Sequence, residues 1–170
     1  MCNFAPLPSD DEANTELESG DVVKVQLGAH IDGYPAVLAH TVVVGASAQH
    51  PVTGRVADAV RAAQTASDVM IRLMKPGMLN HDIGKKVETA IKEFGVRPVA
   101  NIQTNQFGKD EIDGKKKITV GDDASSRPDA QKLEENEVYG VDLCVTTSPE
   151  GKTKTDESHT AIYRKTNSTY

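Results

Sequence analysis

The sequence predicts a single α+β domain, and three observations carry this prediction. A valine-rich run, an Asp-Gly turn and a second apolar run come first, at 22–44. Two stretches with apolar residues at helical spacing follow, at 56–74 and 80–94. Short β-branched segments separated by polar loops make up most of the remainder. With 170 residues, the chain is long enough for one sizeable core and short for two.

The first expected element is a β-hairpin. Residues 22–27 are rich in valine, Asp32-Gly33 is a turn signal, and residues 37–44 are again apolar. Asp-Gly favours the positive φ angles that a two-residue hairpin loop needs. The sequence therefore predicts two antiparallel strands joined at this turn. His30 and His40 flank the turn and could face each other across the hairpin.

Two amphipathic helices are expected next. Apolar positions recur at helical spacing from Val56 to Met74, and the sequence Lys-Pro-Gly at 75–77 stops the pattern. The second pattern begins with Asn80 as the N-cap, carries apolar residues on one face as far as Phe94, and ends at Gly95 as the C′ residue.

Shorter strands are expected after the second helix. The pattern predicts strands around 98–103 and 118–120, separated by a polar loop that ends in three consecutive lysines at 115–117, the lysine loop. A buried strand is expected at 138–145 and a final strand at 160–163. The order of hairpin, helices and further antiparallel strands is typical of an α+β domain.

Composition limits the functions that are open to the chain. The chain has nineteen Lys and Arg and twenty-five Asp and Glu, which gives a formal net charge of −6. This charge argues against a protein that binds nucleic acid through its overall positive charge. Six of the acids and no Lys or Arg lie in residues 1–21, which predicts an acidic, irregular lead-in before one domain at 22–170. The sequence shows no membrane-spanning run, signal peptide or disulfide framework, so we expect a soluble intracellular protein.

Several segments resemble a known family. The segment GDVVKVQLGAHIDGY at 20–34, followed by AHT at 39–41, resembles the metal-bearing hairpin of type 2 methionine aminopeptidases. It is more similar to their non-peptidase relatives, the proliferation-associated (ErbB-receptor-binding) and curved-DNA-binding proteins. The similarity continues in order through residues 52–55, 72–77, 112–115 and 137–142. This resemblance implies the pita-bread fold, in which helices flank an antiparallel sheet and a central cleft holds the active site of the enzymes.

The resemblance also locates the positions of a two-metal site, which in the enzymes is built from two Asp, one His and two Glu. Four of these positions fall here on Gln26, Val37, Asn105 and Asp142, and the fifth would lie beyond Tyr170. Glutamine offers only a neutral oxygen and valine has no donor atom. We therefore expect no catalytic residue, no bound metal and no cofactor, with Asp142 as a relic. The alternative is a misaligned hairpin whose true ligands lie elsewhere.

The non-peptidase relatives are described as associating with curved DNA, structured RNA and ribosomes. The resemblance thus implies a cytoplasmic and nuclear protein that binds RNA or the ribosome. DNA is the second candidate for its ligand. His30 and His40 are the candidates for residues of the former substrate cleft. A solvated charged face is the alternative for the lysine loop. The candidate nucleic-acid-binding residues are Lys115, Lys116, Lys117, Lys152, Lys154, Arg164 and Lys165.

Two other functions remain open from the sequence. The first is an active metal-dependent methionine aminopeptidase. The second is a protein-binding scaffold or transcriptional corepressor that uses the former substrate cleft. Members of the family extend beyond both ends of this chain, so we expect a truncated gene product, a gene-model fragment or a reduced member of the family. Such a part would expose sheet edges and apolar helix faces, which predicts protein partners at those surfaces.

Overall fold

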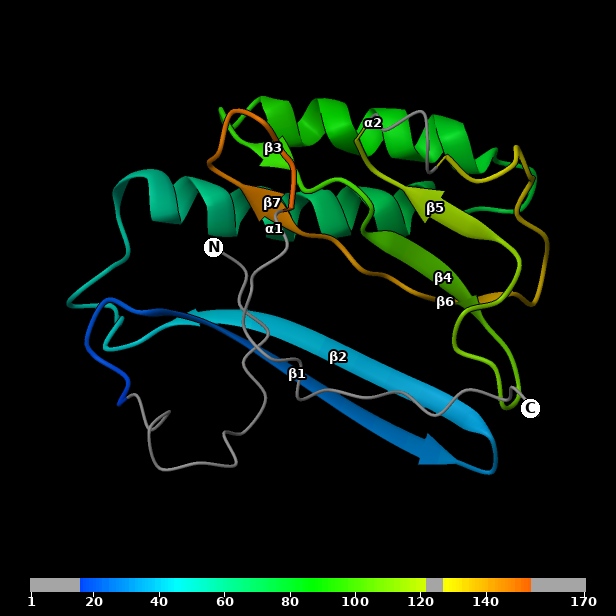
Figure 1. Cartoon of the computed structure of the whole chain (residues 1–170), viewed down its shortest axis with the longest axis horizontal. Helices are drawn as coiled ribbons and strands as arrows, with labels where there is room; N and C mark the ends of the chain where they lie inside the picture. Colours follow the sequence, from blue (N-terminus) through cyan, green and yellow to red (C-terminus); the bar gives the residue numbers. More distant parts are fainter. Residues whose placement is uncertain (1–15, 122–126, 154–170) are drawn as a thin grey trace.

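The computed structural model describes residues 16–121 and 127–153 (Figure 1). The elements are β1 (Val22–Ile31), β2 (Tyr34–Val43), α1 (Gly54–Leu73), α2 (Asn80–Lys92), β3 (Arg97–Pro98), β4 (Gln103–Phe107), β5 (Lys117–Thr119), β6 (Val138–Gly140) and β7 (Val145–Thr146). The predicted order of a hairpin, two helices and further strands is confirmed, and with it the α+β class. The predicted strand at 160–163 and most of the acidic lead-in lie outside the described residues.

The hairpin has the predicted turn. β1 and β2 pair antiparallel, and Asp32 and Gly33 both have positive φ, at 51° and 89°. A type I′ turn requires this conformation at both central residues, and its twist matches that of the two strands. In Figure 1 the hairpin lies at the bottom of the molecule, below the two helices and the sheet β5-β4-β6.

The register separates the two histidines of the hairpin. His30 lies opposite Pro35, and His40 lies opposite Val25. Successive side chains of a strand point to opposite faces, and positions 25 and 30 are an odd number of residues apart. His30 and His40 therefore lie on opposite faces, and the prediction that they face each other is wrong.

The hydrophobic core lies between the helices and the three-stranded sheet β5-β4-β6. Small residues on α1 let α2 approach closely, while branched residues of α2 and β5 fill the space between the helices and the sheet. Among the described residues, the members of the core come from outside the hairpin. They are Ala62, Ala66, Met70, Ile83, Val87, Ile91, Val96, Ile118, Val120 and Leu133.

Asn80 is the first residue of α2 and not its N-cap, so that prediction is wrong. The residue is only 2% exposed. Its side-chain amide donates hydrogen bonds to the carbonyl oxygens of Lys117 (2.9 Å) and Asp129 (2.8 Å). Its side-chain oxygen accepts from the backbone N–H groups of His81 (2.9 Å) and Gln131 (3.1 Å). Asn80 thus joins the start of α2 to two segments that are distant in sequence.

The later strands are shorter than predicted. The expected strand at 98–103 is divided between β3 and the first residue of β4, and Asn101 between them has a φ of 67°. The expected strand at 138–145 is divided into β6 and β7. The division has a tertiary cause, because β6 pairs with β4 whereas β7 pairs with β3 in a separate sheet. Gly95 follows α2 with a φ of 67°, the left-handed conformation expected of a helix-terminating glycine.

Candidate functional site

Two of the four expected metal positions lie together on the hairpin. Gln26 of β1 is opposite Ala39, and Val37 of β2 is opposite Gly28. Positions 26 and 28 point to the same face of β1, so Gln26 and Val37 are diagonal neighbours across the two strands. Both residues are exposed. The hairpin therefore presents one amide and one isopropyl group where the enzymes are expected to place two carboxylates.

Asn105 lies in the central strand β4 of the three-stranded sheet. Its neighbour Thr104 is fully buried on the helix side, where the Thr104 hydroxyl lies 3.4 Å from the sulfur of Met70. Asn105 therefore points to the face away from the helices. Its Nδ2 donates to the backbone oxygen of Gln103 (3.2 Å), and its Oδ1 is buried and accepts no hydrogen bond from the described residues.

Asp142 lies between β6 and β7 and is exposed. Its backbone N–H donates to the Thr104 hydroxyl oxygen (3.0 Å), which fixes the chain at this point. Desolvation by the surrounding protein raises the pKa of the Asp142 carboxyl, and a hydrogen bond from the backbone N–H of Leu143 opposes this rise. Asp142 is the one carboxylate among the four expected metal positions.

These donors do not fit a pair of divalent cations. Such cations take oxygen and nitrogen ligands, and a bridged pair draws much of its stability from negatively charged carboxylates. Gln26 and Asn105 offer neutral oxygens, and Val37 offers none. In the described part of the chain, no three His, Cys, Asp or Glu side chains form a group that could hold a metal ion.

The tip of the hairpin rests on the loop between β4 and β5. The backbone N–H of Asp110 donates to the carbonyl oxygen of Gly33 (2.6 Å), and the His30 Nε2 lies 3.8 Å from the Asp110 Oδ1. Both side chains of the His30–Asp110 pair are largely exposed, so the pair itself adds little stability. The contact shows that the face of the hairpin that carries His30 turns toward the rest of the molecule at its tip.

Lys116, one of the candidate nucleic-acid-binding residues, already has partners. Its Nζ lies 2.5 Å from the Glu137 Oε1 and 3.1 Å from the Glu134 Oε1. It also donates to the backbone oxygen of Lys132 (2.9 Å). A lysine held in this way is a poor candidate for a phosphate contact. The sequence carried no signal for these contacts, because the partners are 16 to 21 residues away in polar loop sequence.

The other candidates differ in their availability. Lys115 and Lys152 are exposed, and Lys117 is half-buried in β5. Lys154, Arg164 and Lys165 lie outside the described residues.

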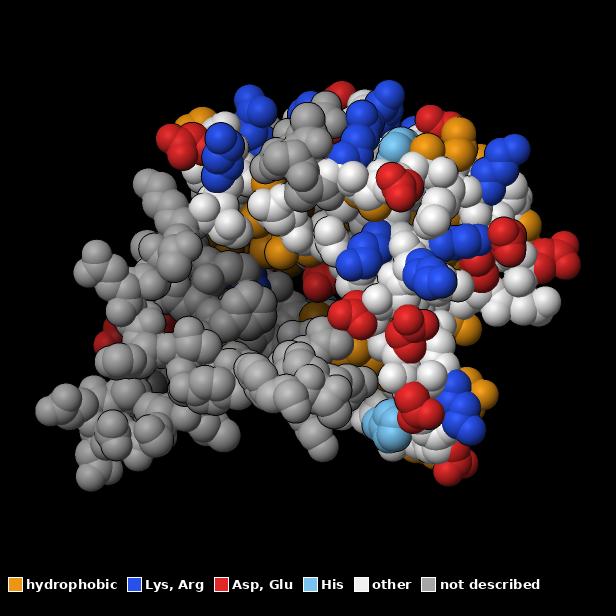
Figure 2. Space-filling view, turned by 45° about the vertical axis from the view of Figure 1, so that its right-hand side comes forward, with side chains coloured by type: hydrophobic (Ala, Val, Ile, Leu, Met, Phe, Trp, Pro, Cys, Tyr) orange, Lys and Arg blue, Asp and Glu red, His pale blue; other side chains and the backbone are white. Residues whose placement is uncertain are grey.

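The helix α2 adds further positive charge. Figure 2 shows blue side chains along the upper part of the molecule, where α2 runs, with red ones among them. Lys92 of α2 pairs with Glu88 at 2.6 Å, so part of this charge is neutralised within the helix. No described helix has the length and apolar character needed to cross a membrane.

Glu137 is the centre of a polar network beside Lys116. Its Oε2 accepts hydrogen bonds from the Tyr139 hydroxyl (2.9 Å) and from the backbone N–H of Glu134 (2.8 Å). Desolvation acts to raise the pKa of the Glu137 carboxyl, but the hydrogen bonds from Lys116, Glu134 and Tyr139 outweigh it and hold that pKa below its usual value. The Glu137 and Glu134 carboxylates in turn raise the pKa of Lys116, against the opposing effect of desolvation.

This network predicts a pH dependence of stability. A carboxyl whose pKa is lowered by folding contributes stability above its unfolded pKa, and that stability is lost as the pH falls through the folded pKa. We expect the free energy of unfolding, measured by urea denaturation, to decrease with falling pH below the ordinary glutamate value of 4.5. Glu137→Gln should reduce this slope. Glu135→Gln, an exposed neighbour outside the network, should retain it, and an equal slope in all three proteins would contradict the prediction.

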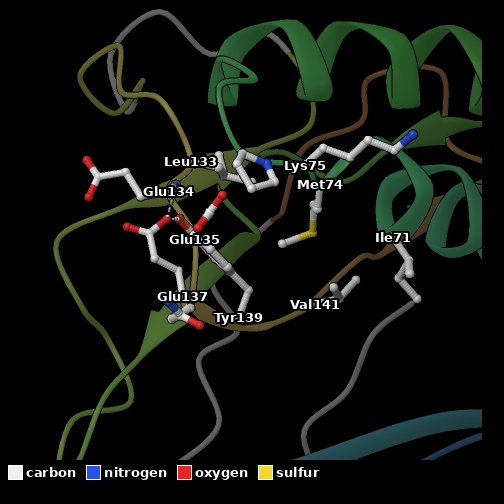
Figure 3. A pocket seen from close by; sticks show the side chains of 11 residues that line it. Ile71, Met74, Lys75, Leu133, Glu134, Glu135, Glu137, Tyr139 and Val141 are labelled. Atoms are coloured by element: carbon white, nitrogen blue, oxygen red, sulfur yellow. Dashed lines mark hydrogen bonds between the residues drawn. The ribbon is translucent and has the colours of Figure 1, made fainter.

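A groove of about 370 Å³ lies between the end of α1 and the segment that leads into β6. Figure 3 shows Ile71, Met74 and Val141 along one side of it, while the carboxylates of Glu134, Glu135 and Glu137 gather at the other end. The groove contains neither hairpin histidine and none of the four expected metal positions. It is therefore distinct from the expected cleft. Its lining residues are Ile71, Met74, Lys75, Pro76, Leu133, Glu134, Glu135, Asn136, Glu137, Tyr139 and Val141.

Comparison with known proteins gives consistent matches over nearly the whole chain. The family model of "Metallopeptidase family M24" matches residues 2–151. The chain is 44% identical to "Curved DNA-binding protein" of Schizosaccharomyces pombe, over 99% of this chain and 44% of that protein. It is 38% identical to "ERBB-3 binding protein 1" of Solanum tuberosum, over 97% of this chain and 41% of that protein. It thus spans less than half the length of these curated relatives.

A solved structure, "Structure of a thermophilic Arx1", superposes with a TM-score of 0.84 at 30% identity. The match covers 100% of this chain and 51% of that one. Methionine aminopeptidases also match, over shorter stretches of the chain.

Proposed function

This chain belongs to metallopeptidase family M24, and from this premise we propose that it is a non-catalytic member that works by binding nucleic acid. The proposed ligand is RNA in a ribonucleoprotein or the ribosome, with DNA as the second choice. The proposal that the protein is non-catalytic rests on Gln26 and Val37, which lie on one face of the hairpin. This pair cannot supply the two carboxylates that a two-metal site requires.

The names of the relatives support a binding role. The relative from Schizosaccharomyces pombe is named for binding curved DNA, and the one from Solanum tuberosum for binding ERBB-3. We propose that this chain is likewise a binding protein with a peptidase fold. We further propose that it is located in the cytoplasm and the nucleus.

The chemistry of the surface favours contacts to the nucleic-acid backbone. The chain has a net charge of −6, so attraction to phosphate must come from local groups of lysines. Lys115 and Lys117 flank Lys116 in the lysine loop, and Lys152 is exposed after β7. The chain has three Phe, four Tyr and no Trp, which leaves few aromatic side chains for stacking on bases. Recognition of shape and backbone, as in structured RNA, fits this surface best.

A filter-binding titration against a structured RNA over a range of salt concentrations tests the proposal. The triple variant Lys115→Glu, Lys117→Glu, Lys152→Glu should weaken binding roughly tenfold or more at about 0.1 M salt, because each phosphate contact adds to the salt-dependent affinity. The charge-matched triple variant Lys24→Glu, Arg61→Glu, Lys75→Glu, at exposed positions outside the set of candidate residues, should bind as the wild type does.

Two results would contradict the proposal. Absence of salt-dependent retention of RNA, or equal weakening in both triple variants, would argue against a nucleic-acid site at these lysines. Stoichiometric manganese or cobalt in the purified protein, together with cleavage of a methionyl peptide, would establish the aminopeptidase alternative instead.

A further inference from the structure

The lysine loop joins β4 through a bulge beside Gln106. The backbone N–H of Gly114 donates to the carbonyl oxygen of Gln106 (2.9 Å), and the N–H of Gln106 donates to the carbonyl oxygen of Lys116 (3.0 Å). Residues on both sides of Lys115 therefore share one partner on β4, so the chain bulges at Lys115. Lys115 is exposed, whereas Gly114 is buried.

The bulge depends on a glycine. A Cβ atom at position 114 would lie 2.7 Å from the carbonyl oxygen of Gln106, closer than real Cβ atoms come to any atom. This oxygen belongs to the backbone of the central strand of the sheet, which cannot move aside as a flexible side chain does. Gly114 thus allows the loop to lie directly against β4.

Side chains fix the same point of the loop from the other side of β4. Lys116 forms its ion pairs with Glu137 and Glu134, and the Gln106 Nε2 lies 3.4 Å from the Glu137 Oε1. Gln106 is directly opposite Tyr139 of β6, whose hydroxyl also donates to Glu137. The Lys116 and Glu137 side chains are only 17% and 10% exposed, so solvent screens this pair less than an exposed one.

Lys116 and Lys117 point to opposite faces of the sheet. Ile118 lies in the core on the helix side, so the adjacent Lys117 points away from the helices. Lys116 extends across β4 toward the segment that leads into β6. The contacts of Lys116 therefore fix the backbone of the loop, while the side chains of its two neighbours are directed elsewhere.

On the basis of the RNA-binding function proposed above, we propose that Lys116 and Glu137 are positioning residues. Their ion pair fixes the bulge so that Lys115 and Lys117 are already ordered when they meet phosphate, and neither Lys116 nor Glu137 touches the RNA. An ordered pair of lysines binds more tightly than a mobile pair, because less conformational entropy is lost on binding.

The sign of the effect of removing an acid tests this inference. Removal of a negative charge near a phosphate-binding surface normally strengthens the binding of RNA. Glu137→Gln should instead weaken filter binding of a structured RNA by about threefold to tenfold, as expected when one or two long side chains lose their order. Glu135→Gln makes the same change of charge at an exposed neighbour outside the network, and should bind at least as tightly as the wild type.

Gly114→Ala tests the bulge without any change of charge. It should weaken RNA binding to an extent similar to Glu137→Gln, because the loop can no longer lie against β4. Ile91→Val is the control for a general loss of stability. This buried position lies at the other end of α2 from Asn80, so the change should lower stability by about 1 kcal/mol and leave RNA binding unaltered. Circular dichroism confirms that each variant is folded.

A further measurement separates positioning from a structural role alone. In a background of Lys115→Ala and Lys117→Ala, Glu137→Gln should cause no additional loss of the remaining RNA binding, because the residues through which it acts are absent. Lys116→Arg should retain most of the binding of the wild type, since a guanidinium group can pair with the same carboxylates.

The outcomes distinguish this inference from the proposed function. RNA binding by Glu137→Gln that equals or exceeds that of Glu135→Gln would overturn the inference, and so would unaltered binding by Gly114→Ala. Both results would leave the proposed function intact if substitution of Lys115, Lys117 and Lys152 still weakens binding. A wild type that shows no salt-dependent binding of RNA would contradict the proposed function, and the inference with it.

Discussion

Gly84→Ala is expected to destabilise the protein by about 3 kcal/mol or more, although glycine to alanine inside a helix normally stabilises by roughly 1 kcal/mol. Gly84 is buried in α2, where the helix lies against β5. A Cβ atom at this position would approach the carbonyl oxygen of Thr119 more closely than real Cβ atoms approach any atom. The obstacle is the backbone of a paired strand, which cannot move aside as a flexible side chain does. Steric overlap therefore outweighs helix propensity.

Urea denaturation measures this effect as a shift in the midpoint at unchanged slope. Lys85→Ala is the matched control, because it changes the next residue of the same helix at an exposed position. Its effect should be within about 0.5 kcal/mol of the wild type. A midpoint for Gly84→Ala at or above that of the wild type would show that α2 and β5 can move apart without a loss of stability.

Asn80→Asp is expected to cost about 3 kcal/mol or more, although the two side chains have nearly the same shape. The amide of Asn80 donates to two backbone oxygens, those of Lys117 and Asp129. A carboxylate cannot donate, so both oxygens would lose their partner. In addition, a negative charge would be placed against them in a site that is only 2% exposed.

The control for this change is Asn136→Asp. Asn136 is exposed and has a φ of 64°, a conformation that Asp tolerates, so the same chemical change should leave the urea midpoint nearly unaltered. Equal losses in the two variants would show that the hydrogen bonds of Asn80 contribute nothing specific. Because Asn80 bonds to the backbone of Lys117, Asn80→Asp should also loosen the lysine loop and weaken RNA binding.

Local chemistry made several elements predictable. The Asp32-Gly33 turn is encoded by two adjacent residues that accept positive φ, and the two helices are encoded by apolar residues at a period that only a helix satisfies. The resemblance in sequence predicted the pita-bread fold, which is confirmed by the match to family M24 and by methionine aminopeptidase structures. It also predicted similarity to the proliferation-associated (ErbB-receptor-binding) and curved-DNA-binding proteins, which is likewise confirmed.

Other features could not be inferred because they depend on partners that are distant in sequence. Asparagine is a residue type that favours N-cap positions. Only the hydrogen bonds of Asn80 with Lys117 and Asp129 show that it is a buried residue that joins three segments of the chain. In the sequence, Lys116 is one of three consecutive lysines. In the structure, it forms ion pairs with Glu137 and Glu134. The sequence alone does not distinguish a lysine in an ion pair from one that faces solvent.

The amino-acid sequence by itself determined the hairpin, the two helices, the family and the residue types at the expected metal positions, because these follow from local conformational preference and from the identity of side chains. Tertiary structure alone decided which side chains meet. Strand register separated His30 from His40 and placed Gln26 beside Val37. The physical reason is that a strand alternates its two faces at every residue, so a shift of one position in pairing exchanges every contact that the hairpin makes.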